Sequence, residues 1–153
     1  MDDWGKVMVF GVRPNEACVI RPSAYGLVED DRGRLAVVRT SQGTFLPGGG
    51  IEAGETAEKA IKREALEECG LVIRLGTWTA RAIQFVYAES ERTHFQKRST
   101  FIQGFVDAAG DGFNSVGFES DHELLWVNPE AAIQMLSHQS HCWAVERWRH
   151  CSS

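Results

Sequence analysis

The sequence has no long apolar run and no excess of positive charge. No apolar stretch approaches the roughly 18 residues that a membrane-spanning helix needs, so a membrane protein is not expected. The first residues, Met1 to Gly5, lack the basic and then apolar segment of a secretory leader, which predicts a cytoplasmic protein. A net charge of -5 argues against an extended nucleic-acid partner, which requires a basic surface. A small phosphate ligand bound through a cation remains compatible with this charge.

Closely spaced cysteines, repeats, low-complexity segments and linkers are also missing. The four cysteines, Cys18, Cys69, Cys142 and Cys151, form no CxxC pair, so we expect free thiols and regard a zinc site as the weaker alternative. With 153 residues, of which 43% are hydrophobic and 24% charged, the chain is predicted to form one globular domain over residues 1–153.

The hydrophobic pattern predicts an α/β protein. Strands are expected at residues 6–12, 19–29, 35–38, 44–46, 71–79, 82–88, 99–106 and 124–127, with a hairpin turn at 30–33. Helices are expected at residues 56–69, 129–136 and 141–149. The first helix is the best defined, since Thr56 is a suitable N-cap and Gly70 a suitable C-terminal glycine. This order fits a mixed sheet with helices packed on its faces.

Three carboxylates dominate one face of the helix at residues 56–69. Glu64, Glu67 and Glu68 are spaced i, i+3 and i+4, which places them together on that face. Two such charges about 5 Å apart repel each other by roughly 3 kcal/mol at an effective dielectric constant of about 20. A hard cation such as Mg²⁺ or Mn²⁺ would relieve this repulsion. The alternative is an acidic face that is merely solvated.

A glycine loop at residues 47–54 precedes this helix. Consecutive glycines allow positive φ and a close approach of the backbone to a ligand, and they can turn a carbonyl toward a metal ion. A flexible turn is the alternative interpretation of the loop. Ala57, Ala60, Ile61 and Ala65 flank the carboxylates, so this part of the helix is expected to face the protein interior.

Together the loop and the helix resemble the signature of a known family. Gly49, Glu55 and the run from Arg63 to Leu71 match the Nudix box, which reads G-x5-E-x7-R-E-U-x-E-E-x-G-U, where U is a bulky aliphatic residue. All the charged and glycine positions of the box are filled, and Ala65 at the first U position is the single departure. The sequence is therefore similar to MutT-like Nudix hydrolases, with the box at residues 49–71.

The resemblance implies a Nudix α/β/α sandwich with a mixed β-sheet between helices. It also implies that Glu64, Glu67 and Glu68 bind one to three divalent cations, Mg²⁺ or Mn²⁺, joined by the carbonyl of Gly48. A further acidic ligand is expected from a later loop, where Glu119 is the first choice and Asp121 and Glu123 are its rivals.

The resemblance assigns two more residues of the box to supporting roles. Arg63 would orient the carboxylates through charge-assisted hydrogen bonds. Glu55 would secure the loop to the helix, or it would only improve the electrostatics at the helix start.

The implied activity is metal-dependent hydrolysis of a diphosphate linkage in a nucleotide. Bound cations neutralise the phosphates, and a carboxylate, Glu64 or Glu67, removes a proton from the attacking water. The alternative is a Nudix-like regulatory module that binds a nucleotide without cutting it, although such modules usually lose box carboxylates. Nucleoside triphosphates, dinucleoside polyphosphates, nucleotide sugars such as ADP-ribose and capped RNA ends are all open as substrates, and a homodimer is one of the open oligomeric states.

Residues outside the box supply candidates for substrate binding. Arg39, Phe45 and Tyr87 are predicted near the mouth of the site, where an arginine holds a phosphate and an aromatic ring stacks on a base. Tyr87 follows Leu71 by 16 residues, a distance at which Nudix proteins acting on dinucleoside polyphosphates often carry tyrosine and ADP-ribose hydrolases carry proline. The alternative is that Tyr87 simply ends a strand.

Four residues near the C-terminus are interpreted as structural rather than functional. His138 and His141, spaced i and i+3, are expected as surface histidines, with a ligand pair as the alternative. Trp143 and Trp148 are expected in the packing of the last helix, with a base-stacking platform as the alternative.

Overall fold

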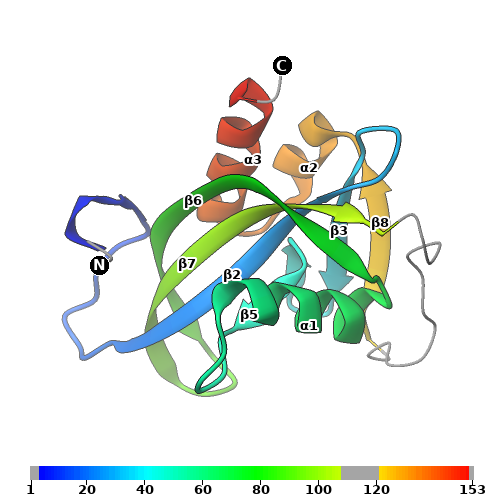
Figure 1. Ribbon diagram of the computed structural model, residues 1–153. Helices are drawn as coiled ribbons and strands as arrows, with labels where there is room; N and C mark the ends of the chain where they lie inside the picture. The colour runs from blue at the N-terminus through cyan, green and yellow to red at the C-terminus, as the bar shows by residue number, and fades with distance from the viewer. Residues whose placement is uncertain (1–3, 108–120, 152–153) are drawn as a thin grey trace.

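The computed structural model describes residues 4–107 and 121–151, and its centre is a mixed eight-stranded sheet between helices (Figure 1). Helix α1 (Ala57–Cys69) covers one face, and helices α2 (Pro129–Met135) and α3 (Gln139–Cys151) cover the other. The predicted α/β class with a mixed sheet between helices is therefore confirmed. Within the described residues, every helix is too short or too polar to cross a bilayer.

The sheet contains both parallel and antiparallel pairs of strands. Its order is β1-β6-β7-β2-β3-β4, with β5 paired to β2 and β8 to β3, and only β1/β6 and β2/β7 are parallel pairs. The strands are β1 (Met8–Phe10), β2 (Val19–Glu29), β3 (Leu35–Thr40), β4 (Gly43–Phe45), β5 (Gly48–Gly50), β6 (Ile73–Ala88), β7 (Thr93–Val106) and β8 (Glu123–Val127). A short 3-10 helix, η1 (Trp4–Lys6), precedes them.

Several predicted strand boundaries were wrong. The strands expected at 71–79 and 82–88 are one strand, β6, because a β-bulge between Leu75 and Thr79 absorbs the break in pattern without ending the pairing. Its partner β7 begins at Thr93 rather than at 99, since the two strands form a long hairpin. The strand expected at 6–12 covers only Met8–Phe10.

The predicted hairpin at residues 19–38 exists, but its two strands diverge at once. Only Glu29 and Leu35 pair across β2 and β3, while β2 runs parallel to β7 along its whole length. The Asp30 carboxylate closes the turn by accepting the backbone N–H groups of Arg32 and Arg34, both with N–O distances of 2.9 Å. Divergence of β2 from β3 leaves room for β5 beside β2, and this places the glycine loop within the sheet.

Two hydrophobic cores lie on opposite faces of the sheet. Under α1, the expected inner residues Ala60, Ile61 and Ala65 are fully buried. On the other face, Trp148 is buried and Trp143 packs against the same core, as predicted. Full burial of a side chain such as that of Ile61 contributes about 1.5–3 kcal/mol to the free energy of unfolding. Both cores therefore stabilise the central strands.

His141 is part of the second core, and the prediction of a surface position was wrong. Its side chain is 1% exposed, its ring centroid lies 4.3 Å from that of Tyr25, and its Nδ1 accepts the Leu46 N–H at 3.2 Å. The reason is that α3 begins at Gln139 and turns residue 141 toward the sheet. Burial holds the pKa of His141 well below its usual value. The four cysteines are free thiols, as expected.

Candidate active site

Both ends of α1 have the predicted caps. Thr56 has an extended backbone, and its hydroxyl accepts the Lys59 N–H at 3.2 Å. At the other end Gly70 has φ 65°, a left-handed conformation, and its N–H bonds to carbonyls of the last turn. These caps fix the length of the helix and therefore the direction in which its carboxylates point.

The glycine loop becomes strand β5, which the sequence did not predict. Gly48, Gly49 and Gly50 pair antiparallel with Tyr25, Ala24 and Ser23 of β2. Gly48 has φ 152°, and a Cβ there would overlap the backbone of β2. Only glycine lets this segment lie against β2 and under α1 at the same time.

Two of the three carboxylates contact this strand directly. Glu68 accepts the Gly48 N–H at 2.9 Å, and the Glu64 carboxylate occupies the space that a Cβ on Gly49 would need. Their side chains are only 13% and 15% exposed, whereas that of Glu67 is 49% exposed. The three predicted metal ligands therefore share one helix face, and two of them are enclosed between α1 and β5.

Arg63 connects the helix, the loop and the carboxylates. Its Nε donates to Glu55 at 2.8 Å, its Nη1 to Glu67 at 3.2 Å, and its Nη2 to the Gly50 carbonyl at 3.1 Å. Glu64 lies 3.7 Å from the same guanidinium. The bond from Arg63, with a second from the Glu52 N–H, lowers the pKa of Glu55 to about 2. Reciprocally, the hydrogen bond to Glu55 raises the pKa of Arg63.

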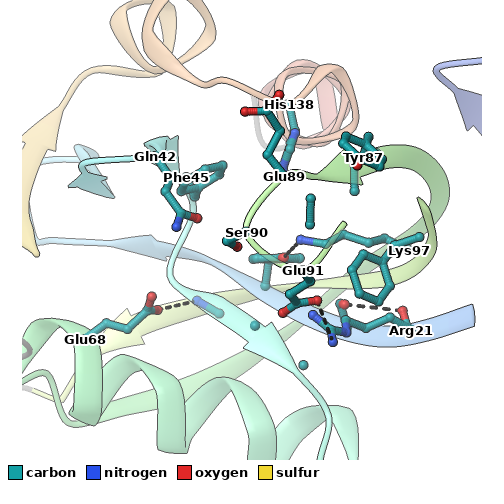
Figure 2. A pocket seen from close by; sticks show the side chains of 18 residues that line it. Arg21, Gln42, Phe45, Glu68, Tyr87, Glu89, Ser90, Glu91, Lys97 and His138 are labelled. Atoms are coloured by element: carbon teal, nitrogen blue, oxygen red, sulfur yellow. Dashed lines mark hydrogen bonds and ion pairs between the residues drawn. The ribbon is translucent and has the colours of Figure 1, made fainter. Parts of the chain in front are cut away.

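A cavity of about 700 Å³ opens beside this cluster (Figure 2). Its walls come from β2, β4, β5, β7, the β6–β7 hairpin, the α2–α3 connection and, through Glu68, helix α1. The lining residues used below are Arg21, Tyr25, Gln42, Phe45, Gly48, Glu68, Tyr87, Glu91, Lys97 and His138. Glu68 of α1 therefore lies at the edge of a space large enough for a small nucleotide, with Glu64 one turn before it on the helix.

The structure brings together some of the predicted site residues and separates others. Phe45 and Tyr87 line the cavity, and Tyr87 is 50% exposed with its ring centroid 4.7 Å from that of His94. Within the described residues, Arg39 does not line the cavity. It forms an ion pair with Glu123 at 3.1 Å across β3 and β8.

The donor set on α1 matches the chemistry of a divalent cation of the magnesium type. Carboxylates of Glu64, Glu67 and Glu68 supply hard oxygen ligands, and the crowded backbone of Gly48 and Gly49 leaves no room for a side chain between them. Among residues 4–107 and 121–151, no three acidic, histidine or cysteine side chains already converge on a single point. The predicted ligand Glu119 lies outside the described residues.

Sequence reasoning missed several residues of this region. His122 lies 3.7 Å from Glu68, and His138, Lys97 and Arg21 line the cavity. The register of β2 with β7 places Arg21 opposite Lys97, and a parallel pair so distant in sequence gives no local signal.

Comparison with known proteins identifies the family of this chain. A model of the NUDIX domain matches residues 19–147 of this chain. The chain belongs to the Nudix family. An ADP-ribose pyrophosphatase of Methanocaldococcus jannaschii is 37% identical over 71 residues, which are 44% of this chain and 39% of that protein. The match thus spans well under half the length of that relative.

Solved structures share the Nudix fold at low sequence identity. The MutT protein from Methanosarcina mazei Go1 has a TM-score of 0.64 and 21% identity, with 91% of this chain and 100% of that chain covered. A C. elegans Ap4A hydrolase has a TM-score of 0.65 and 15% identity, with 85% and 96% covered. These likenesses confirm the predicted Nudix sandwich, and the resemblance to MutT-like proteins is confirmed with it.

Proposed function

We propose that this Nudix protein is a hydrolase that cuts a diphosphate linkage in a nucleotide and that it requires Mg²⁺ or Mn²⁺. The observation that carries the proposal is the position of Glu64 and Glu68 between α1 and β5, with Glu68 lining the 700 Å³ cavity. A merely solvated acidic face would not enclose two carboxylates against a backbone strand at a cavity wall.

Glu64, Glu67 and Glu68 are the proposed cation ligands, with the carbonyl of Gly48 and, from outside the described residues, Glu119. A divalent cation bound there would offset the negative charge of the diphosphate and make the attacking water more acidic. Glu67 is exposed and long, so it can leave Arg63 and turn toward the other two carboxylates.

The protein's own residues would orient the reaction. Arg63 holds Glu55 and Glu67 and thereby fixes the loop relative to the helix. The Gly48 N–H holds one oxygen of Glu68, and the second oxygen lies 3.7 Å from the His122 ring. Glu64 or Glu67 would accept the proton of the attacking water, and Glu64 is the more enclosed of the two.

The cavity offers separate places for the parts of a nucleotide. Phe45 and His138 form an aromatic wall with ring centroids 5.1 Å apart, and Gln42 adds an amide beside them. A base would stack on this wall and bond to the amide. Because one relative is an ADP-ribose pyrophosphatase, ADP-ribose is the first substrate to test, followed by nucleoside triphosphates and diadenosine tetraphosphate.

The test is a hydrolysis panel with purified protein, run with millimolar Mg²⁺ or Mn²⁺ and again with excess chelator. We expect release of a nucleoside monophosphate or of pyrophosphate from at least one nucleotide, and loss of release with the chelator. Nucleotide binding without hydrolysis at any metal concentration would support the alternative of a regulatory module.

The remaining expectations outside the site stay predictions. A single domain over residues 1–153 and a cytoplasmic location follow from the sequence alone. Gel filtration with light scattering would decide whether the protein is a monomer or a homodimer.

A further inference from the structure

Lys97 lines the cavity from strand β7. Its strand, β7, is separated from β5 by β2, and Lys97 is directly opposite Arg21 in the parallel register. Two strand spacings amount to about 10 Å. Lys97 and the glycine strand therefore line the same cavity from two separate strands, with β2 between them. Figure 2 shows its side chain extending into the cavity opposite Glu68.

The ammonium group of Lys97 has no acidic partner among residues 4–107 and 121–151. Its one hydrogen bond goes to the Tyr25 hydroxyl, 3.3 Å from Nζ, which is a neutral group. The other cations at this site are paired, since Arg21 lies 3.7 Å from Glu91 and Arg63 bonds to several glutamates. A half-buried charge without a counter-charge lowers the stability of the folded protein, so an anion bound beside Lys97 would offset this loss.

The surroundings of Lys97 respond to its charge. Burial, together with the positive charge of Lys97, lowers the pKa of His138 to about 4. The pKa of His141 is lowered by burial, with His138 and Lys97 adding to the effect. Both rings are neutral at physiological pH, so they add no positive charge beside Lys97 and present aromatic surface around it.

We propose that Lys97 is a specificity-determining residue that binds a phosphate group of the substrate, on the side of the cavity opposite the α1 carboxylates. This inference rests on the proposed function and deepens it, because it requires a substrate with an anionic group outside the cation-binding cluster. The Tyr25 hydroxyl orients the ammonium, and the paired rings of Phe45 and His138 line the same cavity.

The first test does not depend on hydrolysis. Lysines of the wild-type protein are acetylated with and without millimolar inorganic pyrophosphate, in chelator, and the sites are quantified by mass spectrometry. We expect pyrophosphate to slow labelling of Lys97 and to leave labelling of Lys62, which is exposed on α1, unchanged. Equal labelling of Lys97 in both conditions, or equal protection of both lysines, would overturn the proposal.

The second test uses the best substrate of the hydrolysis panel. Lys97→Met keeps the length of the side chain and removes its charge, and we expect KM to rise about tenfold or more with kcat within about threefold of wild type. Lys97→Arg should recover most of the lost affinity, and Lys62→Met is the matched control. An unchanged KM, or a fall in kcat alone, would contradict the role.

The two tests separate this inference from the proposed function. Hydrolysis without protection of Lys97 would reject the phosphate contact and keep the enzyme. Protection of Lys97 in a protein that hydrolyses no nucleotide would keep the anion site and reject the hydrolase.

Discussion

The carboxylate of Glu68 accepts a hydrogen bond from the backbone N–H of Gly48, with 2.9 Å between nitrogen and oxygen. This bond joins the last turn of α1 to the first residue of β5, 20 positions earlier in the chain. Arg63 makes a second connection through the Gly50 carbonyl at 3.1 Å. Helix and strand are therefore positioned as one unit, and disturbing either should displace the carboxylates.

Substitution of adjacent glycines tests this coupling. Gly49→Ala would place a methyl group on the Glu64 carboxylate, whereas Gly50→Ala would meet no atom within 4 Å. We expect kcat of Gly49→Ala to fall about 10- to 100-fold, because small misplacements of catalytic groups are costly, and Gly50→Ala to remain near wild type. Equal activity of the two variants, measured on the same substrate, would contradict the proposed position of Glu64.

Divalent cations should stabilise the folded protein. Repulsion among Glu64, Glu67 and Glu68 is relieved when a cation binds the folded state, and a concentration about 100 times Kd adds about 2.7 kcal/mol. We expect millimolar Mg²⁺ or Mn²⁺ to raise Tm in a thermal melt, and Glu67→Gln to reduce that rise. A Tm that neither ion changes would favour the solvated acidic face.

The partly buried His138 and the fully buried His141 predict a loss of stability in acid. Burial lowers the pKa of His138 to about 4 and that of His141 still further from its usual value, so the unfolded chain binds protons that the folded protein does not. The free energy of unfolding should therefore decrease as pH falls from about 6.5 toward 4, by about 1.4 kcal/mol per pH unit for each such proton.

Denaturant titrations at several pH values measure this slope, and His138→Gln should reduce it. Stability curves of wild type and His138→Gln that run parallel between these pH values would show that His138 takes no part.

Tyr87 allows a prediction about substrate class. It lines the cavity and is half exposed, so its ring is available to stack on a second base. We expect Tyr87→Ala to lose about 2- to 10-fold more in kcat/KM on diadenosine tetraphosphate than on ATP. An equal loss on both substrates would mean that Tyr87 only ends a strand, and no activity of wild type on the dinucleotide would reject this substrate class.

Local signals in the sequence were sufficient to predict helix α1 and the shared face of its three carboxylates. The caps Thr56 and Gly70 and the spacing of the three glutamates depend on residues within one helix, and the structure has both caps as predicted. The glycine segment was expected as a loop, because its strand pairing depends on β2, more than 20 residues away in sequence.

Long-range packing explains what the sequence did not predict. His141 is buried against the sheet, where its Nδ1 accepts the Leu46 N–H from 95 residues away, and no periodicity within α3 indicates that contact. Arg39 was expected at the cavity, but the antiparallel pairing of β3 with β8 directs it to Glu123. The cavity floor, including Lys97, arises from parallel pairing of β2 with β7, which only the folded chain reveals.

The most direct test of the central claim is the turnover number of single glutamine variants on α1. Glu67→Gln and Glu68→Gln should lower kcat by at least about 10²-fold, because each removes a ligand that offsets transition-state charge. Glu58→Gln, an exposed position in the first turn of the same helix, is the control and should stay near wild type. Circular dichroism would verify that all three variants are folded. Turnover like that of wild type in both Glu67→Gln and Glu68→Gln would contradict the account of these carboxylates as the catalytic centre.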